Sequence, residues 1–150
     1  MSGFVSGALI AVIAAATSPS VAPPSEIIHH TNPVYEENGY PFSLAVEVDG
    51  WVYLSGALGT LPDSVELAPG GIEGESRQVM DNIQTTLEDL GLSMDRIVKC
   101  TIMIENMDEW PAFNAIYASY FDGSFPARSA FGADGLALGA LIEVDCIARR

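Results

Sequence analysis

The apolar residues of this chain change their spacing once along its length, and this change separates a β-hairpin from a helix. Residues 44–48 and 51–56 are two β-rich runs joined by Asp49 and Gly50, a pair that tolerates the positive φ angles of a type I′ turn. Over residues 72–90 the apolar side chains instead recur every three or four positions, which predicts an amphipathic helix. The fold is therefore expected to combine sheet and helix.

The sequence after residue 90 predicts three more strands and one more helix. A strand over 97–104 follows the first helix, which ends at Gly91, and its residues Val98, Cys100, Ile102 and Ile104 are expected to share one face. Asp108 is the expected N-cap of the second helix, whose aromatic residues are interpreted as core. Those aromatic residues are Trp110, Phe113, Tyr117 and Tyr120; the helix is expected to end at Asp122-Gly123, followed by a strand over 128–131, a loop over 132–140 and a closing strand over 141–148.

The resulting order, β-β-α-β-α-β-β, predicts an α/β fold with a mixed sheet and both helices on one face of it. Residues 58–71 are expected to form a surface loop, because they are punctuated by Gly and Pro. No third layer is available to cover the other face of the sheet. Self-association is therefore the expected way to bury that face.

Residues 1–25 contain no Asp, Glu, Lys or Arg, so the formal charge of −14 belongs wholly to residues 26–150. The front stretch is expected to be an apolar leader outside the fold, and residues 26–150 to be one domain. Residues 7–16 have the length of a signal-peptide core but are too short to span a bilayer well. A disordered Ala/Ser/Pro leader is the alternative, and the export reading is slightly favoured. The protein is accordingly expected to be exported or periplasmic with a signal peptide, and cytoplasmic without one.

The cysteines and histidines do not indicate a metal or cofactor site. Cys100 and Cys146 lie in apolar, strand-like runs and are interpreted as small buried hydrophobic residues. Export would allow them to pair, but the sequence does not show whether the strands of Cys100 and Cys146 are neighbours in the sheet. His29 and His30 are expected to lie in a solvated loop, because no Cys or carboxylate stands at ligand spacing from them. No metal and no cofactor are expected.

The charge balance argues against nucleic acid as a partner. Six Lys and Arg residues face twenty Asp and Glu residues, and phosphate contacts from basic residues dominate affinity for nucleic acid. Ribonuclease activity is therefore disfavoured. The acidic surface itself is explained either by solubility through mutual repulsion or by adaptation to a salty medium.

Arg128 is the candidate binding residue, because an isolated guanidinium in an acidic chain is suited to hold one small carboxylate. Glu143 leaves the helix-packed face of the closing strand together with Asp145. If the strand of Arg128 pairs with the closing strand across the loop 132–140, the guanidinium and the Glu143 carboxyl would form an anion clamp with an acid that orders water. The alternative is that Glu143 and Asp145 form an exposed or subunit-facing polar edge.

A set of short motifs between Tyr40 and Arg150 resembles, in order and spacing, the reactive intermediate deaminase (Rid) family of enamine/imine deaminases, some of whose members carry an endoribonuclease L-PSP label. The matching features are Pro41 beside an aromatic residue, Leu54-Ser55-Gly56, Arg77-Gln78 with Asn82, Ile97-Val98-Lys99-Cys100-Thr101, Asn114 with Tyr117 and Tyr120-Phe121, Phe125-Pro126-Ala127-Arg128-Ser129, and Ile142-Glu143-Val144.

The resemblance implies a chorismate-mutase-like subunit and a homotrimer with sheets inside, helices outside and active sites between subunits. It implies hydrolysis of 2-imino acids, such as those formed from 2-aminoacrylate, to 2-keto acids and ammonia. In those terms Arg128 grips the substrate carboxylate and Glu143 positions the water. Ser55, Gly56 and Asn114 are implied to contribute to substrate binding around them.

The chain departs from the family pattern at the edge of the implied site. Phe42 stands where Tyr is usual after the Pro, Ala130 where Cys is common, and Asp134 where a small or basic residue is usual. Phe42 and Ala130 are still expected to line the substrate pocket, and both substitutions are expected to make that pocket wider or drier. A non-catalytic trimer that binds a small metabolite or a protein is the alternative function.

Overall fold

The computed structural model describes residues 25–150, so the leader expected over residues 1–25 lies outside the described residues apart from its last position. Across the described range, no helix is both long and apolar enough to cross a bilayer.

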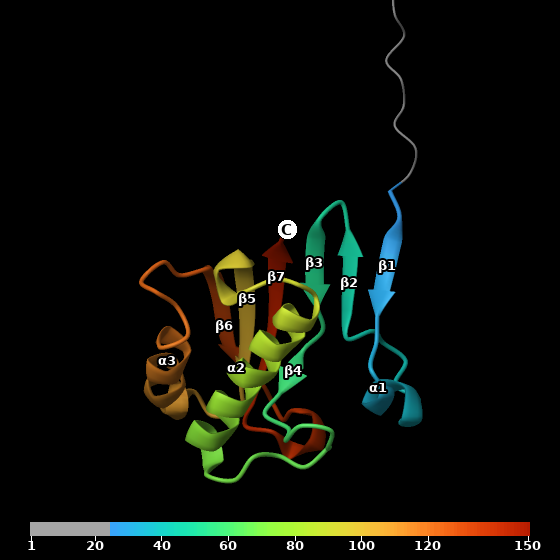
Figure 1. The fold of residues 1–150 in the computed structure, drawn as a ribbon. Helices are drawn as coiled ribbons and strands as arrows, with labels where there is room; N and C mark the ends of the chain where they lie inside the picture. Colours follow the sequence, from blue (N-terminus) through green and yellow to red (C-terminus); the bar gives the residue numbers. More distant parts are fainter. Residues whose placement is uncertain (1–24) are drawn as a thin grey trace, which may run out of the picture.

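A mixed sheet with two main helices on one face forms the body of the described part (Figure 1). The sheet order is β1-β2-β3-β7-β5-β6, with β4 also paired to β7, and β5 and β6 form the parallel pair. The strands are β1 (Ile27–His30), β2 (Ala45–Val48), β3 (Trp51–Leu54), β4 (Ala57–Leu58), β5 (Ile97–Ile104), β6 (Ala127–Gly132) and β7 (Ile142–Arg149). The helices are α1 (Pro33–Glu37), α2 (Gly71–Asp89) and α3 (Trp110–Ala118), with short 3-10 turns η1 (Met94–Arg96), η2 (Met107–Glu109) and η3 (Ala137–Gly139). The predicted α/β class with a mixed sheet is confirmed.

The predicted hairpin and first helix are confirmed. Val48 pairs with Trp51 across a two-residue turn, in which Asp49 has φ 51° and Gly50 has φ 73°, as a type I′ turn requires. Gly91 follows α2 with φ 72°, the left-handed conformation expected of a C′ residue. The predicted surface loop after Gly56 contains the short strand β4, which the sequence pattern did not indicate.

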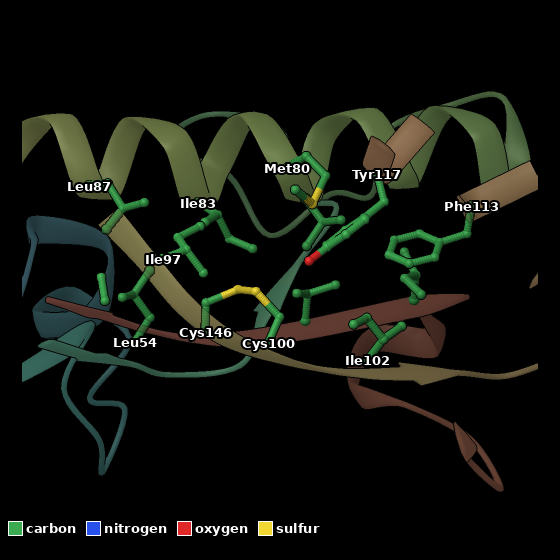
Figure 2. Close-up of a cluster of buried hydrophobic side chains, with 14 of the residues drawn as sticks. Leu54, Met80, Ile83, Leu87, Ile97, Cys100, Ile102, Phe113, Tyr117 and Cys146 are labelled. Carbon is green, nitrogen blue, oxygen red and sulfur yellow. A yellow bond between two sulfur atoms is a disulfide. The ribbon is translucent and has the colours of Figure 1, made fainter. Parts of the chain in front are cut away.

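Helices α2 and α3 pack against each other, and α2 packs against β4 and β7. Figure 2 shows the apolar side chains of α2 pointing toward the sheet, with Tyr117 and Phe113 reaching into the same core from α3. Phe113 and Tyr117 are buried, as predicted for core aromatics, whereas Trp110 and Tyr120 are only partly buried. The fully buried members of this core include Val79, Met80, Ile83, Leu87, Cys100, Ile102, Ile104, Phe113, Ile142, Val144 and Cys146.

The prediction that Val98 shares the inward face of β5 is wrong. Val98 is 43 % exposed while Ile97 is 7 % exposed. The cause is a register shift between Ile97 and Lys99 opposite β7, because a bulge places two successive residues against one partner and reverses the facing of the strand. From Cys100 onward, the predicted inward face is confirmed.

The predicted N-cap at Asp108 is also wrong. The side chain of Asn106 accepts a hydrogen bond from the N–H group of Asp108 at 3.0 Å, so Asn106 caps the turn η2 that leads into α3. Pro111 lies in the first turn of α3, where its missing N–H donor is harmless. The α-helix ends at Ala118, before the predicted end at Asp122-Gly123.

Cys100 and Cys146 form a disulfide across β5 and β7 (Figure 2). The two residues are directly opposite each other in the antiparallel register, and both are fully buried. Their predicted burial is confirmed, and the pairing that the sequence left open is present in the structure. The pairing depends on the adjacency of β5 and β7, which connects residues far apart in sequence.

His29 and His30 lie in strand β1, so their predicted loop conformation is wrong. His30 is opposite Ala45 of β2, and its Nε2 atom is 3.5 Å from Oε2 of Glu47. Strand β1 and the single-turn helix α1 are short and separated by only two residues. Neither is long enough to show a periodic pattern in the sequence.

Candidate active site

Arg128 lies on the edge strand β6 and faces the helices. It is in parallel register with Cys100, whose side chain is in the helix-packed core. Its Cζ atom lies 4.7 Å from the ring centroid of Trp110 and 4.9 Å from that of Tyr117. Both distances are within the range of a cation–π interaction. Two aromatic residues of α3 therefore contact the guanidinium.

A groove of about 460 Å³ opens beside Arg128. Its polar groups are the guanidinium and the side-chain amide of Asn114, and the remaining walls are aromatic or apolar. This combination suits a small anion with an apolar substituent. The lining residues are Asn114, Tyr117, Ala118, Phe125, Pro126 and Arg128.

Glu143 lies on β7 and faces away from the helices. Its neighbours Ile142 and Val144 are fully buried on the helix-packed face, so alternation places the Glu143 carboxyl on the opposite face. Burial raises the pKa of the Glu143 carboxyl, and the nearby Asp145 raises it further. The carboxyl therefore retains its proton to a higher pH than an ordinary glutamate.

Gly56 makes room for that carboxyl. A methyl group on Gly56 would lie 2.9 Å from the carboxyl carbon of Glu143, closer than side chains pack. The backbone of β4 also pairs with β7 at this point, with Leu58 opposite Glu143. Gly56 and Glu143 are thus in direct contact.

Ser55 precedes Gly56 in the chain and links this contact to the segment before β2. The hydroxyl of Ser55 donates a hydrogen bond to the carbonyl of Ser43 at 2.6 Å, which attaches the segment carrying Phe42 to the end of β3. The Phe42 ring is half exposed and stacks on Tyr40 with a centroid distance of 5.4 Å and an interplanar angle of 5°. Ser43, Ser55, Gly56 and Glu143 are therefore connected, whereas the Phe42 ring contacts Tyr35 and Tyr40.

The sequence-based expectation that the strand of Arg128 pairs with the closing strand is wrong. Strand β5 lies between β6 and β7 in the sheet, because the long connection after β6 carries the chain past its neighbour. Arg128 faces the helices, whereas Glu143 faces the uncovered side. One chain consequently holds two separate groups: Arg128 with Asn114, and Glu143 with Gly56 and Ser55.

Ala130 belongs to the first group by strand position. It lies two residues after Arg128 on β6 and is in register with the buried Ile102 of β5. Alternation therefore directs its methyl group toward the helix side, like Arg128. Asp134 is exposed in the connection that follows β6.

Sequence reasoning assigned Trp110 and Tyr117 to the core and missed their contact with Arg128. Helical spacing contained the signal, because residues 110, 114 and 117 are separated by four and three positions and lie on one face of α3. Asn114, which was singled out, lies between the two aromatic residues on that face.

A larger groove of about 550 Å³ lies elsewhere and has the wrong charge for a carboxylate. Its walls include Glu88, Asp95 and Asp122, and no basic residue lines it. Repulsion would keep an anionic substrate out of this groove. Over residues 25–150, no group of three or more His, Cys, Asp or Glu side chains is arranged to hold a metal ion.

The model of the Endoribonuclease L-PSP family matches residues 36–150, and the chain belongs to this family. The resemblance to the Rid deaminases is confirmed by its relatives. The 2-iminobutanoate/2-iminopropanoate deaminase of Mus musculus is 38 % identical over 108 residues, which cover 72 % of this chain and 80 % of the mouse protein. The deaminase of the same name from Capra hircus is 39 % identical over 72 % of this chain and 79 % of the goat protein.

The fold agrees with a solved structure of the same family. YyfA of Yersinia pestis, a member of the conserved Rid protein family, superposes with a TM-score of 0.71 at 41 % sequence identity. The match covers 74 % of this chain and 89 % of YyfA. The two-helix, mixed-sheet subunit is therefore the shared architecture.

Proposed function

We propose that this chain is a hydrolytic deaminase of reactive 2-imino acids, such as those formed when 2-aminoacrylate tautomerises. The products are a 2-keto acid and ammonia. The observation that carries the proposal is Arg128, a guanidinium beside an apolar groove in a chain of net charge −14. The names of the mouse and goat relatives support the same reaction class.

The proposed active unit is a homotrimer in which Arg128 of one subunit meets Glu143 of the next. Apolar side chains on the face of the sheet opposite the helices support association, because large exposed apolar patches mark interaction sites. Trp51 is 37 %, Tyr53 43 % and Phe131 50 % exposed there. A neighbouring sheet that covers these residues would also bring a second chain close to the Glu143 group.

In the proposed reaction, the substrate carboxylate accepts paired hydrogen bonds from Arg128, each worth roughly 1.5–3 kcal/mol. A water held by Glu143 attacks the imine carbon; the new C–O bond forms as the C=N π pair moves to nitrogen. Glu143 accepts a proton from the attacking water and returns it to nitrogen. The carbinolamine hydroxyl then gives its proton to nitrogen through Glu143, the C–N bond breaks with its electron pair leaving on ammonia, and the oxygen lone pair forms the C=O bond of the keto acid. Orientation and electrostatics are sufficient for this hydrolysis.

The direct test is the release of ammonia from enzymatically generated 2-aminoacrylate. Wild type should accelerate it, and Arg128→Ala should abolish the acceleration while the assembly stays intact. Arg128→Lys should recover little, because an ammonium group cannot form the paired contact. The role of Arg128 is wrong if Arg128→Ala hydrolyses imines as fast as wild type.

Mixing two variants that each retain only a small residual rate tests the shared site. Arg128→Ala and Glu143→Gln subunits, unfolded together and reassembled at equal amounts, should regain about one quarter of wild-type activity. The reason is statistical: about three quarters of random trimers are mixed, and each mixed trimer contains one intact site of its three. A site contained in one chain would give no recovery.

The second candidate function is a non-catalytic carboxylate-binding trimer. The observation that favours it is Phe42, which provides a ring without a hydroxyl where the family usually has Tyr. Binding of a 2-keto acid by wild type without any acceleration of ammonia release would establish this alternative.

A further inference from the structure

The guanidinium of Arg128 contacts two aromatic rings, and its N–H groups donate no hydrogen bond to another described residue. The guanidinium carbon lies 4.7 and 4.9 Å from two aromatic centroids. Among residues 25–150, no carboxylate forms an ion pair with Arg128, since the ion pairs there involve His30 and Arg150 with Glu47. A guanidinium carries its five N–H donors in its plane. The ring contacts therefore hold the group while those donors stay without partners among the described residues.

Two other arginines of the chain are held through hydrogen bonds from their N–H groups instead. Arg150 donates from Nε and Nη2 to the two oxygens of Glu47 at 2.6 and 2.9 Å. Arg96 donates from Nε to the carbonyl of Arg149 at 2.8 Å. These contacts occupy the donors that a bound carboxylate would need. Arg128 therefore differs from Arg96 and Arg150, because its N–H donors remain available to a ligand.

We propose that Trp110 and Tyr117 are positioning residues that orient the guanidinium of Arg128 for the substrate carboxylate. This inference rests on the proposed function. A long, exposed arginine side chain loses conformational freedom when it binds a ligand, and ordering it beforehand removes part of that cost. Loss of either ring should weaken carboxylate binding roughly 3- to 30-fold, the range expected for a cation–π contact.

The ring of Tyr117, and not its hydroxyl, is the part that acts. Tyr117 is 2 % exposed, and its hydroxyl has no hydrogen-bond partner among the described residues. Figure 2 shows that hydroxyl directed into the core, on the side of the Cys100–Cys146 disulfide. Tyr117→Phe should therefore keep wild-type affinity, whereas Tyr117→Leu should lose affinity.

The test measures binding of 2-ketobutanoate by calorimetry, together with the kinetics of imine hydrolysis. Trp110→Leu and Tyr117→Leu should raise Kd and KM together while kcat stays within about twofold, because the affected contact is present in both the ground state and the transition state. Trp110→Phe and Tyr117→Phe retain a ring and should restore most of the affinity. Circular dichroism and assembly size serve as controls for folding.

Fluorescence gives a second measurement that does not depend on a destabilised variant. The chain has two tryptophans, Trp51 and Trp110, and Trp51 contacts a different arginine, Arg149, at 5.3 Å. In Trp51→Phe, 2-ketobutanoate should change the emission of Trp110, and adding Arg128→Ala should abolish the change.

The outcomes separate this inference from the proposed function. Folded Trp110→Leu and Tyr117→Leu proteins that bind 2-ketobutanoate as tightly as wild type, or an unchanged Trp110 emission on binding, would overturn the positioning role. Wild-type affinity in Arg128→Ala would instead overturn the role of Arg128 in the proposed function. Weakened binding in both Leu variants, restored in both Phe variants, supports the positioning role.

Discussion

Reduction of the Cys100–Cys146 disulfide should lower the free energy of unfolding by about 4 kcal/mol. The bond links residues separated by 46 positions. In the chain-entropy treatment, a closed loop of that length removes about 13 cal/mol/K from the unfolded chain, or about 4 kcal/mol at 25 °C. Most of this effect belongs to the unfolded state, because both cysteines stay buried in the fold.

Urea unfolding of oxidised and reduced wild type measures the difference without changing any core volume. With a slope of about 2 kcal/mol/M for a domain of this size, the midpoint should fall by about 2 M after reduction. Protein concentration must be equal in both samples, because the proposed association would also contribute to apparent stability. The double variant Cys100→Ala/Cys146→Ala is the matched control and should show no response to the reductant.

Thiol titration in denaturant decides whether the reasoning holds. Oxidised protein should show no reactive thiol before reduction and two after it. Two thiols before reduction would refute the disulfide itself. A bonded protein whose midpoint stays unchanged on reduction would refute the loop-entropy argument, and would indicate an unfolded chain already restricted between β5 and β7.

Three further predictions follow from single residues. Gly56→Ala should displace the Glu143 carboxyl and lower kcat about tenfold or more with little change in KM, measured by ammonia release; an unchanged kcat would contradict the contact. The rate of wild type should fall as pH drops through the raised pKa of Glu143, because the protonated carboxyl cannot accept a proton from water; in Glu143→Gln this acid limb should be absent, and its persistence would assign it to another group. Asn106→Ala should lower the free energy of unfolding by about 1 kcal/mol in urea titrations, and more than Asp108→Ala, with the reverse order favouring Asp108 as the cap.

The sequence predicted the elements whose pattern is long. The nineteen-residue helix α2 and the eight-residue strand β5 show clear periods, and the hairpin turn requires particular residues at two positions. By contrast, β1, α1 and β4 have two to five residues each. Strands β1 and β4 form because neighbouring strands provide partners for their backbones, and no local pattern indicates this. Helix α1 is a single turn capped by Asn32, too short to show a period.

The candidate site was predicted in its residues but not in its arrangement. Arg128 and Glu143 stand out by residue type and by motif, whereas the faces they occupy depend on sheet order. Strands β6 and β7 are consecutive in the sequence, but β5 lies between them in the sheet. This order depends on the fold of the whole chain and not on a local pattern. The same limit applies to Cys100 and Cys146, whose burial is readable from apolar neighbours while their pairing is not.

The opposite facing of Arg128 and Glu143 has a kinetic consequence for the proposed enzyme. A single chain would contain two half-sites and no complete active site. The rate of ammonia release should therefore increase more steeply than linearly with total protein in the concentration range where part of the protein is monomeric. Once association is complete, the rate should become proportional to protein. Imine clearance in a compartment would then depend on a threshold abundance of the protein, and a modest loss of expression below that threshold would remove most of the turnover.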